Sequence, residues 1–181
     1  MTRTHIALLR AVNTSGNKLI KMSELRDFGT SLGLENVRTL IQSGNLVFET
    51  DVRTGAEVER LLEVQAAKQL SLQTNFIVRT AEEWKRIIAN NLLPDYARQD
   101  PSHLLVFTLK EARSAKEFQA LQESINGPEI VRGSGKEAYI AYPDGIGRSK
   151  LTLGVIERRL GTKSTGRNWN TVLKLDALAC T

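Results

Sequence analysis

The chain has 181 residues, of which 41% are hydrophobic and 25% are charged, and its formal net charge is +5. This composition is typical of an ordinary globular protein and argues against intrinsic disorder. No apolar run approaches the roughly eighteen residues of a membrane-spanning helix, and the N-terminal stretch lacks the length and cleavage site of a signal peptide. We therefore expect a cytoplasmic protein with no membrane partner.

Cysteine and histidine are too scarce for two common kinds of structural cross-link. The single Cys180 cannot form an internal disulfide, and with His5 and His103 it cannot supply the usual four ligands of a zinc site. We expect a reducing compartment, no metal and no cofactor.

The basic residues are concentrated at the two ends of the chain. Residues 1–22 carry a net charge of +4 and residues 148–181 a net charge of +5, whereas the segment between them carries −4. If the two ends meet in space, they form an anion site. The alternative is that these are scattered, solvated surface charges.

Helical and strand patterns alternate through the first part of the chain. The expected elements are a strand over 5–12, a helix over 23–32, strands over 36–42 and 45–50, a helix that follows Thr54, and a strand over 72–79. Gly33 stands where a left-handed helix end is needed, and Gly44 favours a hairpin between the second and third strands. Thr54 and Glu57 form a capping box before the second helix.

The same order of elements recurs in the rest of the chain. After a capping box of Thr80 and Glu83, the expected elements are a short helix, a linker over 90–102, a strand over 103–109, a helix through Phe118 and Ile125, strands over 129–132 and 136–142, a helix over 149–160, a short strand over 164–169 and a last helix capped by Asn170.

These patterns predict an α+β fold. It consists of two tandem ferredoxin-like (βαββαβ) halves with antiparallel sheets and a C-terminal helical extension. The first half covers 1–80, a connecting helix and linker cover 81–102, and the second half covers 103–181 with the C-terminal helix.

Several sequence stretches resemble a known bacterial family. They are ALLRAVNTSGNKLIKMSEL, NVRTLIQSGNLVF, SKL, ERRLG and GRNWNTVLKL, and they are similar to the family catalogued as domain of unknown function 1697, nearly end to end. The family pattern has two glycines in the first loop, where this chain has Ala11 and Ser15, and a threonine where Gly166 stands. The resemblance implies a paired ferredoxin-like architecture and no established activity.

The first candidate site lies where the loop after the first strand meets the predicted hairpin. In a βαββαβ unit the first two strands run the same way, so the two connections emerge at one edge of the sheet. The candidate ligand-binding residues are Arg10, Asn13, Lys18, Lys21, Gln42, Ser43, Gly44 and Asn45. Cationic and amide donors of this kind suit phosphate or carboxylate. The alternative is that these residues only satisfy the conformations of two turns.

The C-terminal segment extends the same candidate anion site. Its members are Ser149, Lys150, Arg167, Asn168, Trp169 and Asn170, near two expected helix starts, and Arg148 adds a positive charge at the first of them. Helix N-termini beside cations favour anions. The alternative is that Ser149 and Asn170 are ordinary N-caps and that Trp169 packs on the domain face.

Sharper catalytic motifs are missing. The GSGK sequence at 133–136 lacks the first glycine and the final Ser/Thr of a phosphate-binding loop, so it predicts a hairpin turn instead. Neither histidine has an acid or nucleophile that the sequence identifies as its partner. The catalytic residues therefore stay unknown.

Three functional hypotheses follow. The first is a binding module for an anionic ligand, either a nucleic-acid backbone or a nucleotide-like small molecule. The second is a cofactor-free enzyme that acts on a phosphorylated or carboxylated metabolite. The third is a protein-interaction scaffold that uses an exposed sheet edge. The sequence does not determine the oligomeric state.

Overall fold

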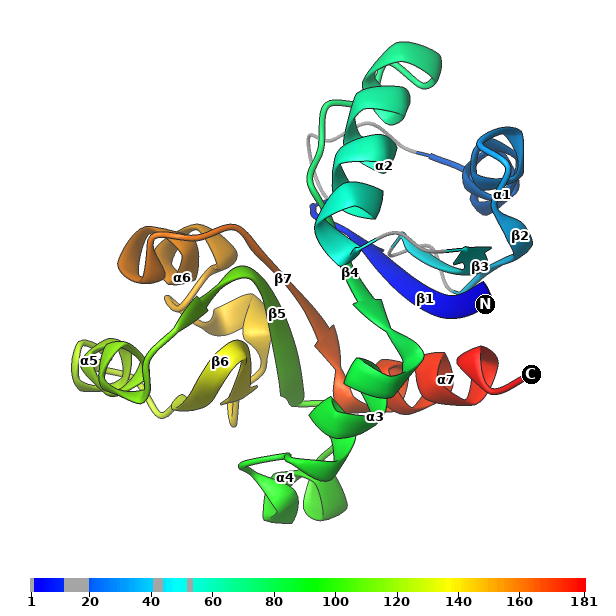
Figure 1. Ribbon diagram of the computed structural model, residues 1–181. Coiled ribbons are helices and arrows are strands. Elements are labelled where there is room, and N and C mark those ends of the chain that lie inside the picture. Colours follow the sequence, from blue (N-terminus) through cyan, green and yellow to red (C-terminus); the bar gives the residue numbers. More distant parts are fainter. Residues whose placement is uncertain (1, 12–19, 41–43, 52–53) are drawn as a thin grey trace. The chain divides into compact units, whose positions relative to one another are not determined.

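The structure of the protein is a computed structural model, and it describes residues 2–11, 20–40, 44–51 and 54–181. The chain divides into two compact units. One comprises Met1–Arg86 together with Leu175–Thr181, and the other comprises Ile87–Lys174. Each unit contains an antiparallel sheet with helices packed on it (Figure 1), so the predicted α+β class with antiparallel sheets is confirmed.

The first unit has a four-stranded sheet with the strand order β2-β3-β1-β4. Its elements are β1 (Thr2–Leu9), α1 (Met22–Ser31), β2 (Glu35–Thr39), β3 (Asn45–Asp51), α2 (Gly55–Gln69), β4 (Phe76–Thr80) and the start of α3 (Ala81–Ala89). Every neighbouring pair of strands is antiparallel, so β1 and β2 run in the same direction.

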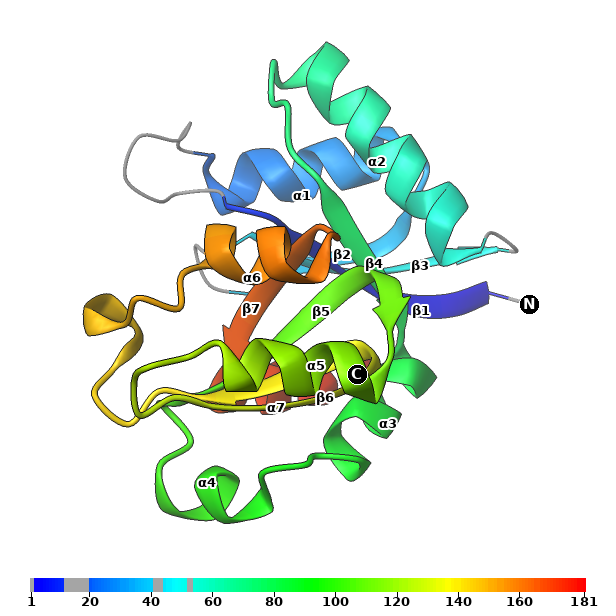
Figure 2. The ribbon, with the colours of Figure 1, turned by 90° about the vertical axis from the view of Figure 1, so that its left-hand side faces the viewer.

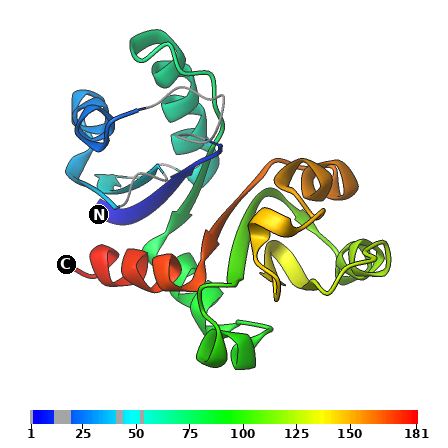
Figure 3. The same ribbon diagram turned by 180° about the vertical axis from the view of Figure 1, so that it is seen from behind.

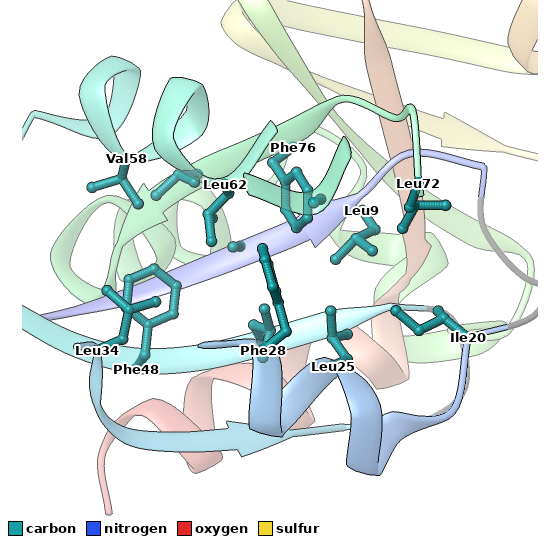
Figure 4. Close-up of a cluster of buried hydrophobic side chains, with 14 residues drawn as sticks. Leu9, Ile20, Leu25, Phe28, Leu34, Phe48, Val58, Leu62, Leu72 and Phe76 are labelled. Carbon is teal, nitrogen blue, oxygen red and sulfur yellow. The ribbon is translucent and has the colours of Figure 1, made fainter. Parts of the chain in front are cut away.

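One face of this sheet carries the core of the first unit. Alternate residues of β1, β3 and β4 point toward α1 and α2, as the two-residue period of a strand requires. Phe48 and Phe76 pack there with Phe28 of α1 and Leu62 of α2, and all four are buried (Figure 4). Burial of this apolar surface holds both helices against the sheet.

Glutamate side chains cover the outer edge of β4. The backbone N–H groups of Phe76 and Val78 donate to Glu63 Oε1 and Glu59 Oε1, each at 2.9 Å. Both glutamates lie on α2, four residues apart, and therefore on one face of that helix. The N–H of Thr80 likewise donates to Glu83 Oε2 at 2.8 Å.

The second unit has a three-stranded sheet with the order β6-β5-β7. Its elements are the end of α3, α4 (Pro94–Gln99), β5 (Leu104–Arg113), α5 (Ala115–Glu123), β6 (Ile130–Ala141), a short 3₁₀ helix (Ile146–Arg148), α6 (Leu153–Leu160), β7 (Ser164–Asn168) and the start of α7 (Trp169–Ala179). Helices α5 and α6 lie on the same side of the sheet (Figures 2 and 3). Their core includes Phe107, Phe118 and Ile156.

The prediction of two strands around Gly133-Ser134-Gly135 is wrong. A single strand, β6, runs through this sequence, and Arg113 of β5 pairs with Gly135. Gly133 is required because a Cβ at this position would lie 2.4 Å from the ring of Phe118. The GSGK sequence is therefore part of a strand rather than a hairpin turn.

Two predicted helix starts also need correction. The 149–160 segment contains a helix only from Leu153, where the hydroxyl of Thr152 accepts from the N–H of Val155 at 3.4 Å. At α7 the cap is Asn168 rather than Asn170, because Asn168 Oδ1 accepts from the N–H of Thr171 at 2.9 Å.

Local signals elsewhere are confirmed. Gly33 and Gly44 have positive φ angles of 76° and 77°. The capping box of Thr54 and Glu57 is formed, and the side chains of Thr80 and Glu83 exchange the same pair of bonds with backbone N–H groups. Among the residues that the structure describes, no helix is long and apolar enough to cross a membrane.

Candidate functional site

Three of the predicted site residues of the first unit lie at one end of its sheet. The N–H of Leu9 donates to the carbonyl oxygen of Gly44 at 2.8 Å, and Leu8 pairs with Asn45. Arg10 follows directly, and its N–H donates to the carbonyl oxygen of Asn75 at 2.9 Å. Arg10, Gly44 and Asn45 thus lie where the end of β1 meets the start of β3.

The side chain of Asn45 has a structural role. It is fully buried, and its amide donates to the carbonyl oxygen of Leu40 at 2.7 Å, which closes the hairpin. Lys21 is exposed at the start of α1, and its backbone N–H donates to Glu24 Oε2 at 3.0 Å. Four other predicted members, Asn13, Lys18, Gln42 and Ser43, lie outside the described residues.

A cavity of about 430 Å³ lies in the second unit. Its walls come from the loop between α5 and β6, the segment before α6, and α6 itself. The polar and charged side chains that line it belong to Ser124, Asn126, Glu129, Asp144, Arg148, Ser149, Lys150 and Arg159. Ile125, Leu151 and Val155 supply apolar wall. A volume of this size suits a small metabolite.

Three basic side chains line this cavity. Arg148, Lys150 and Arg159 are exposed, and none of them forms an ion pair with any residue that the structure describes. Unpaired guanidinium and ammonium groups at a concave surface attract phosphate and carboxylate.

Glu129 is the one buried charged group in the cavity wall, with 7% of its surface exposed. Its Oε1 accepts a short hydrogen bond from the hydroxyl of Ser149. The oxygen of Ser149 in turn accepts from the N–H of Leu151 at 2.9 Å. Ser149 therefore orients Glu129 and is not the helix N-cap of the alternative interpretation.

Neighbouring residues fix the position of Glu129. Gln122 of α5 donates to the carbonyl oxygen of Glu129 at 3.2 Å and accepts from the N–H of Val131 at 2.6 Å. Gly127 leaves room for the carboxylate, since a Cβ there would lie 2.2 Å from Glu129 Oε2. Burial raises the pKa of Tyr142, and the nearby charge of Glu129 raises it further.

The predicted residues at the end of β7 do not line the cavity. Arg167 is buried, and its guanidinium donates to Thr165 Oγ1 at 2.8 Å and to the carbonyl oxygen of Gly166 at 2.9 Å. Burial lowers the pKa of Arg167 to about 10, which still leaves it charged at neutral pH. Asn168 caps α7 and Trp169 is buried. Asn170 is exposed in the first turn of α7.

His103 has an acidic partner that the sequence did not identify. Its Nδ1 lies 2.6 Å from Asp100 Oδ2, and both side chains are about two-fifths exposed. This hydrogen bond is the main reason that the pKa of Asp100 is lowered. His103 is not among the residues that line the cavity, so the pair does not give the cavity a general base.

The described part of the chain contains no group of three or more His, Cys, Asp or Glu side chains that could hold a metal ion.

The sequence matches a known family over most of its length. The family described as "Protein of unknown function (DUF1697)" matches residues 1–139. The chain belongs to the DUF1697 family. The DUF1697 match ends within β6, so it includes Glu129, whereas Ser149, Lys150 and Arg159 follow it.

A solved structure supports this fold for the DUF1697 chain. It is that of conserved bacterial protein SP0830 from Streptococcus pneumoniae, which is 23% identical, has a TM-score of 0.77, and aligns over 99% of each chain. At this identity the likeness concerns the fold. A comparison with curated proteins gave no match.

Arg148, Ser149 and Lys150 were expected from the sequence to lie near an anion, whereas Glu129 and Arg159 were not. The basic residues could have been found from the RSK and ERR clusters that flank the start of α6. Glu129 gave no such signal, because one glutamate before a strand is ordinary. Its burial depends on contacts with α5 and with the segment before α6.

Proposed function

We propose that this DUF1697 protein binds a small anionic molecule, a phosphorylated or carboxylated metabolite, in the cavity of its second unit. The observation that carries the proposal is the presence of three unpaired cations, Arg148, Lys150 and Arg159, around a cavity of about 430 Å³. Such a cavity holds a metabolite, whereas an extended nucleic-acid strand needs an open basic groove.

The burial of Arg167 also favours a small ligand over a nucleic-acid backbone. Arg167 was one of the phosphate contacts expected near the C-terminus, and its guanidinium donates to Thr165 and Gly166 of its own strand. Backbone readers present such side chains to solvent, because each phosphate contact releases counterions.

We also propose that both units are ferredoxin-like. The first unit supports this with its βαββαβ element order and its strand order β2-β3-β1-β4. In the second unit, the long strand β6 takes the place of the second and third strands of the βαββαβ pattern. The cavity then lies beside the helices of the second half.

Anion binding can be measured by isothermal titration calorimetry with inorganic pyrophosphate at low salt. We expect the wild-type protein to bind it, and we expect Arg159→Ala to raise Kd roughly fivefold, since one exposed charge contributes about 1 kcal/mol. The matched control is Arg158→Ala, which removes the adjacent exposed arginine of α6 from outside this cavity.

Two results would contradict the proposal. One is that pyrophosphate, phosphate and short carboxylates all fail to bind to folded protein at low salt. The other is that Arg158→Ala and Arg159→Ala weaken binding equally, because a general effect of positive charge would then account for it. A mixed-sequence oligonucleotide, followed by fluorescence anisotropy, tests the nucleic-acid alternative in the same buffers.

A further inference from the structure

The cavity carries negative as well as positive charge. Glu129 lies in its wall together with Asp144, opposite in sign to the three cations. A site built only for a phosphate or carboxylate gains nothing from a buried carboxylate, because like charges repel the ligand. The presence of a buried carboxylate in an anion-binding cavity therefore needs an explanation.

One oxygen of Glu129 is available to a ligand. Oε1 accepts from the hydroxyl of Ser149, whereas Oε2 accepts from no residue that the structure describes. Oε2 is also accessible to solvent. Among the described residues, the side-chain atoms that are both buried and without a partner are Ser164 Oγ and Asp176 Oδ1, and Glu129 Oε2 is not one of them. A carboxylate oxygen without a donor can accept a hydrogen bond from a ligand, and a cationic donor gives the stronger bond.

The carboxylate is also held in place before a ligand arrives. Ser149 fixes Oε1, Gln122 fixes the backbone on both sides of Ile130, and Gly127 gives Oε2 its space. A charged group that is fixed in this way binds a ligand without losing further side-chain freedom.

We infer that the cavity selects ligands that carry an ammonium group in addition to their anionic group, and that Glu129 Oε2 is the acceptor for that ammonium. This inference rests on the proposed anion binding and adds the chemical class of the ligand. The cations at the rim hold the phosphate or carboxylate, and the buried carboxylate holds the amine. The preferred ligands are thus small zwitterions.

A pair of probes that differ in one group tests this inference. Propyl phosphate and 3-aminopropyl phosphate are titrated by calorimetry into the wild-type protein and into Glu129→Gln. We expect the wild-type protein to bind 3-aminopropyl phosphate at least tenfold more tightly, because a hydrogen bond to a charged group contributes about 1.5–3 kcal/mol. Glu129→Gln should abolish this preference and leave the affinity for propyl phosphate unchanged or higher.

The matched control is Asp144→Asn, which neutralises the exposed carboxylate of the same cavity. It should retain most of the preference. Thermal melting verifies that each variant is folded. If Glu129→Gln does not fold, the two probes on the wild-type protein still test the ligand class, and retention of the preference in Asp144→Asn leaves Glu129 as the carboxylate of this cavity that can account for it.

The results separate this inference from the proposed function. If the wild-type protein binds both probes equally, or if Glu129→Gln retains the preference, the inference is wrong and anion binding stands. If neither probe binds and pyrophosphate does not bind either, the proposed function itself is wrong.

Discussion

His5 is a buried histidine whose environment favours its neutral form. It lies within the sheet of the first unit, where its ring stacks on Phe48 with centroids 5.7 Å apart, and its Nδ1 lies 2.9 Å from the carbonyl oxygen of Arg3. Burial lowers the pKa of His5, although the hydrogen bond to Arg3 and the charge of Glu83 partly oppose this.

A lowered pKa makes the stability of the first unit depend on pH. Below the ordinary histidine pKa of about 6.5, the unfolded chain takes up a proton that the folded chain resists, so the free energy of unfolding falls as the pH falls. The decrease ends once the pH passes the folded pKa. We expect His5→Gln to lack this component, which urea denaturation between pH 7.5 and pH 5 can measure. An unchanged pH dependence in His5→Gln would show that other groups cause it.

Edge strands of both sheets are protected by glutamates from a neighbouring helix. Glu59 and Glu63 of α2 accept from the backbone of β4, and Glu157 of α6 accepts from the N–H of Ser164, the first residue of β7, at 2.9 Å. An open strand edge pairs readily with a foreign strand. The protected edge of β4 thus argues against the idea that a partner strand adds to that side of the sheet.

Removal of one edge acceptor should destabilise the first unit. Glu59→Ala leaves the N–H of Val78, a residue that is 3% exposed, without this acceptor, and a lost acceptor at a buried donor costs about 1–3 kcal/mol. Urea denaturation measures the change. Arg60→Ala, an exposed neighbour on α2, is the control and should cost less than about 0.5 kcal/mol. Equal effects of the two variants would mean that helix propensity, not the acceptor, is responsible.

The accuracy of the sequence predictions depended on whether a signal was local. The Thr54–Glu57 capping box and the turn at Gly44 involve a few adjacent residues, and both are as predicted. Within β6, Gly133 lies so close to the ring of Phe118 that a Cβ would be 2.4 Å from it, and no local pattern reveals that contact. The candidate site depends even more on distant contacts, because Glu129, Ser149 and Arg159 come together only in the folded second unit.

At the scale of the whole molecule, each compact unit contains one of the two tryptophans. Trp84 belongs to the first unit and Trp169 to the second. Both are buried, so unfolding changes the surroundings and hence the fluorescence of each ring. A Trp169→Phe background isolates the signal of the first unit.

In that background, we expect Leu175→Ala to destabilise the first unit although this residue follows the second unit in the chain. Leu175 is fully buried, and loss of a buried leucine typically costs about 2–5 kcal/mol. Leu173→Ala is the control, because Leu173 is 43% exposed. Urea denaturation followed at Trp84 provides the measurement. If the two variants lose equal stability, the C-terminal segment is not part of the first unit in solution.

Because Leu175–Thr181 belongs to the first unit, that unit cannot complete its folding until the end of the chain has been synthesised. A ribosome that has passed Arg86 has not yet made Leu175 or Ala179, both of which are buried. At the usual rate of about 5–20 residues per second, the second unit takes on the order of 4 to 18 s to be made. For that interval the nascent first unit lacks these two side chains, and the apolar surface that they cover stays exposed to water.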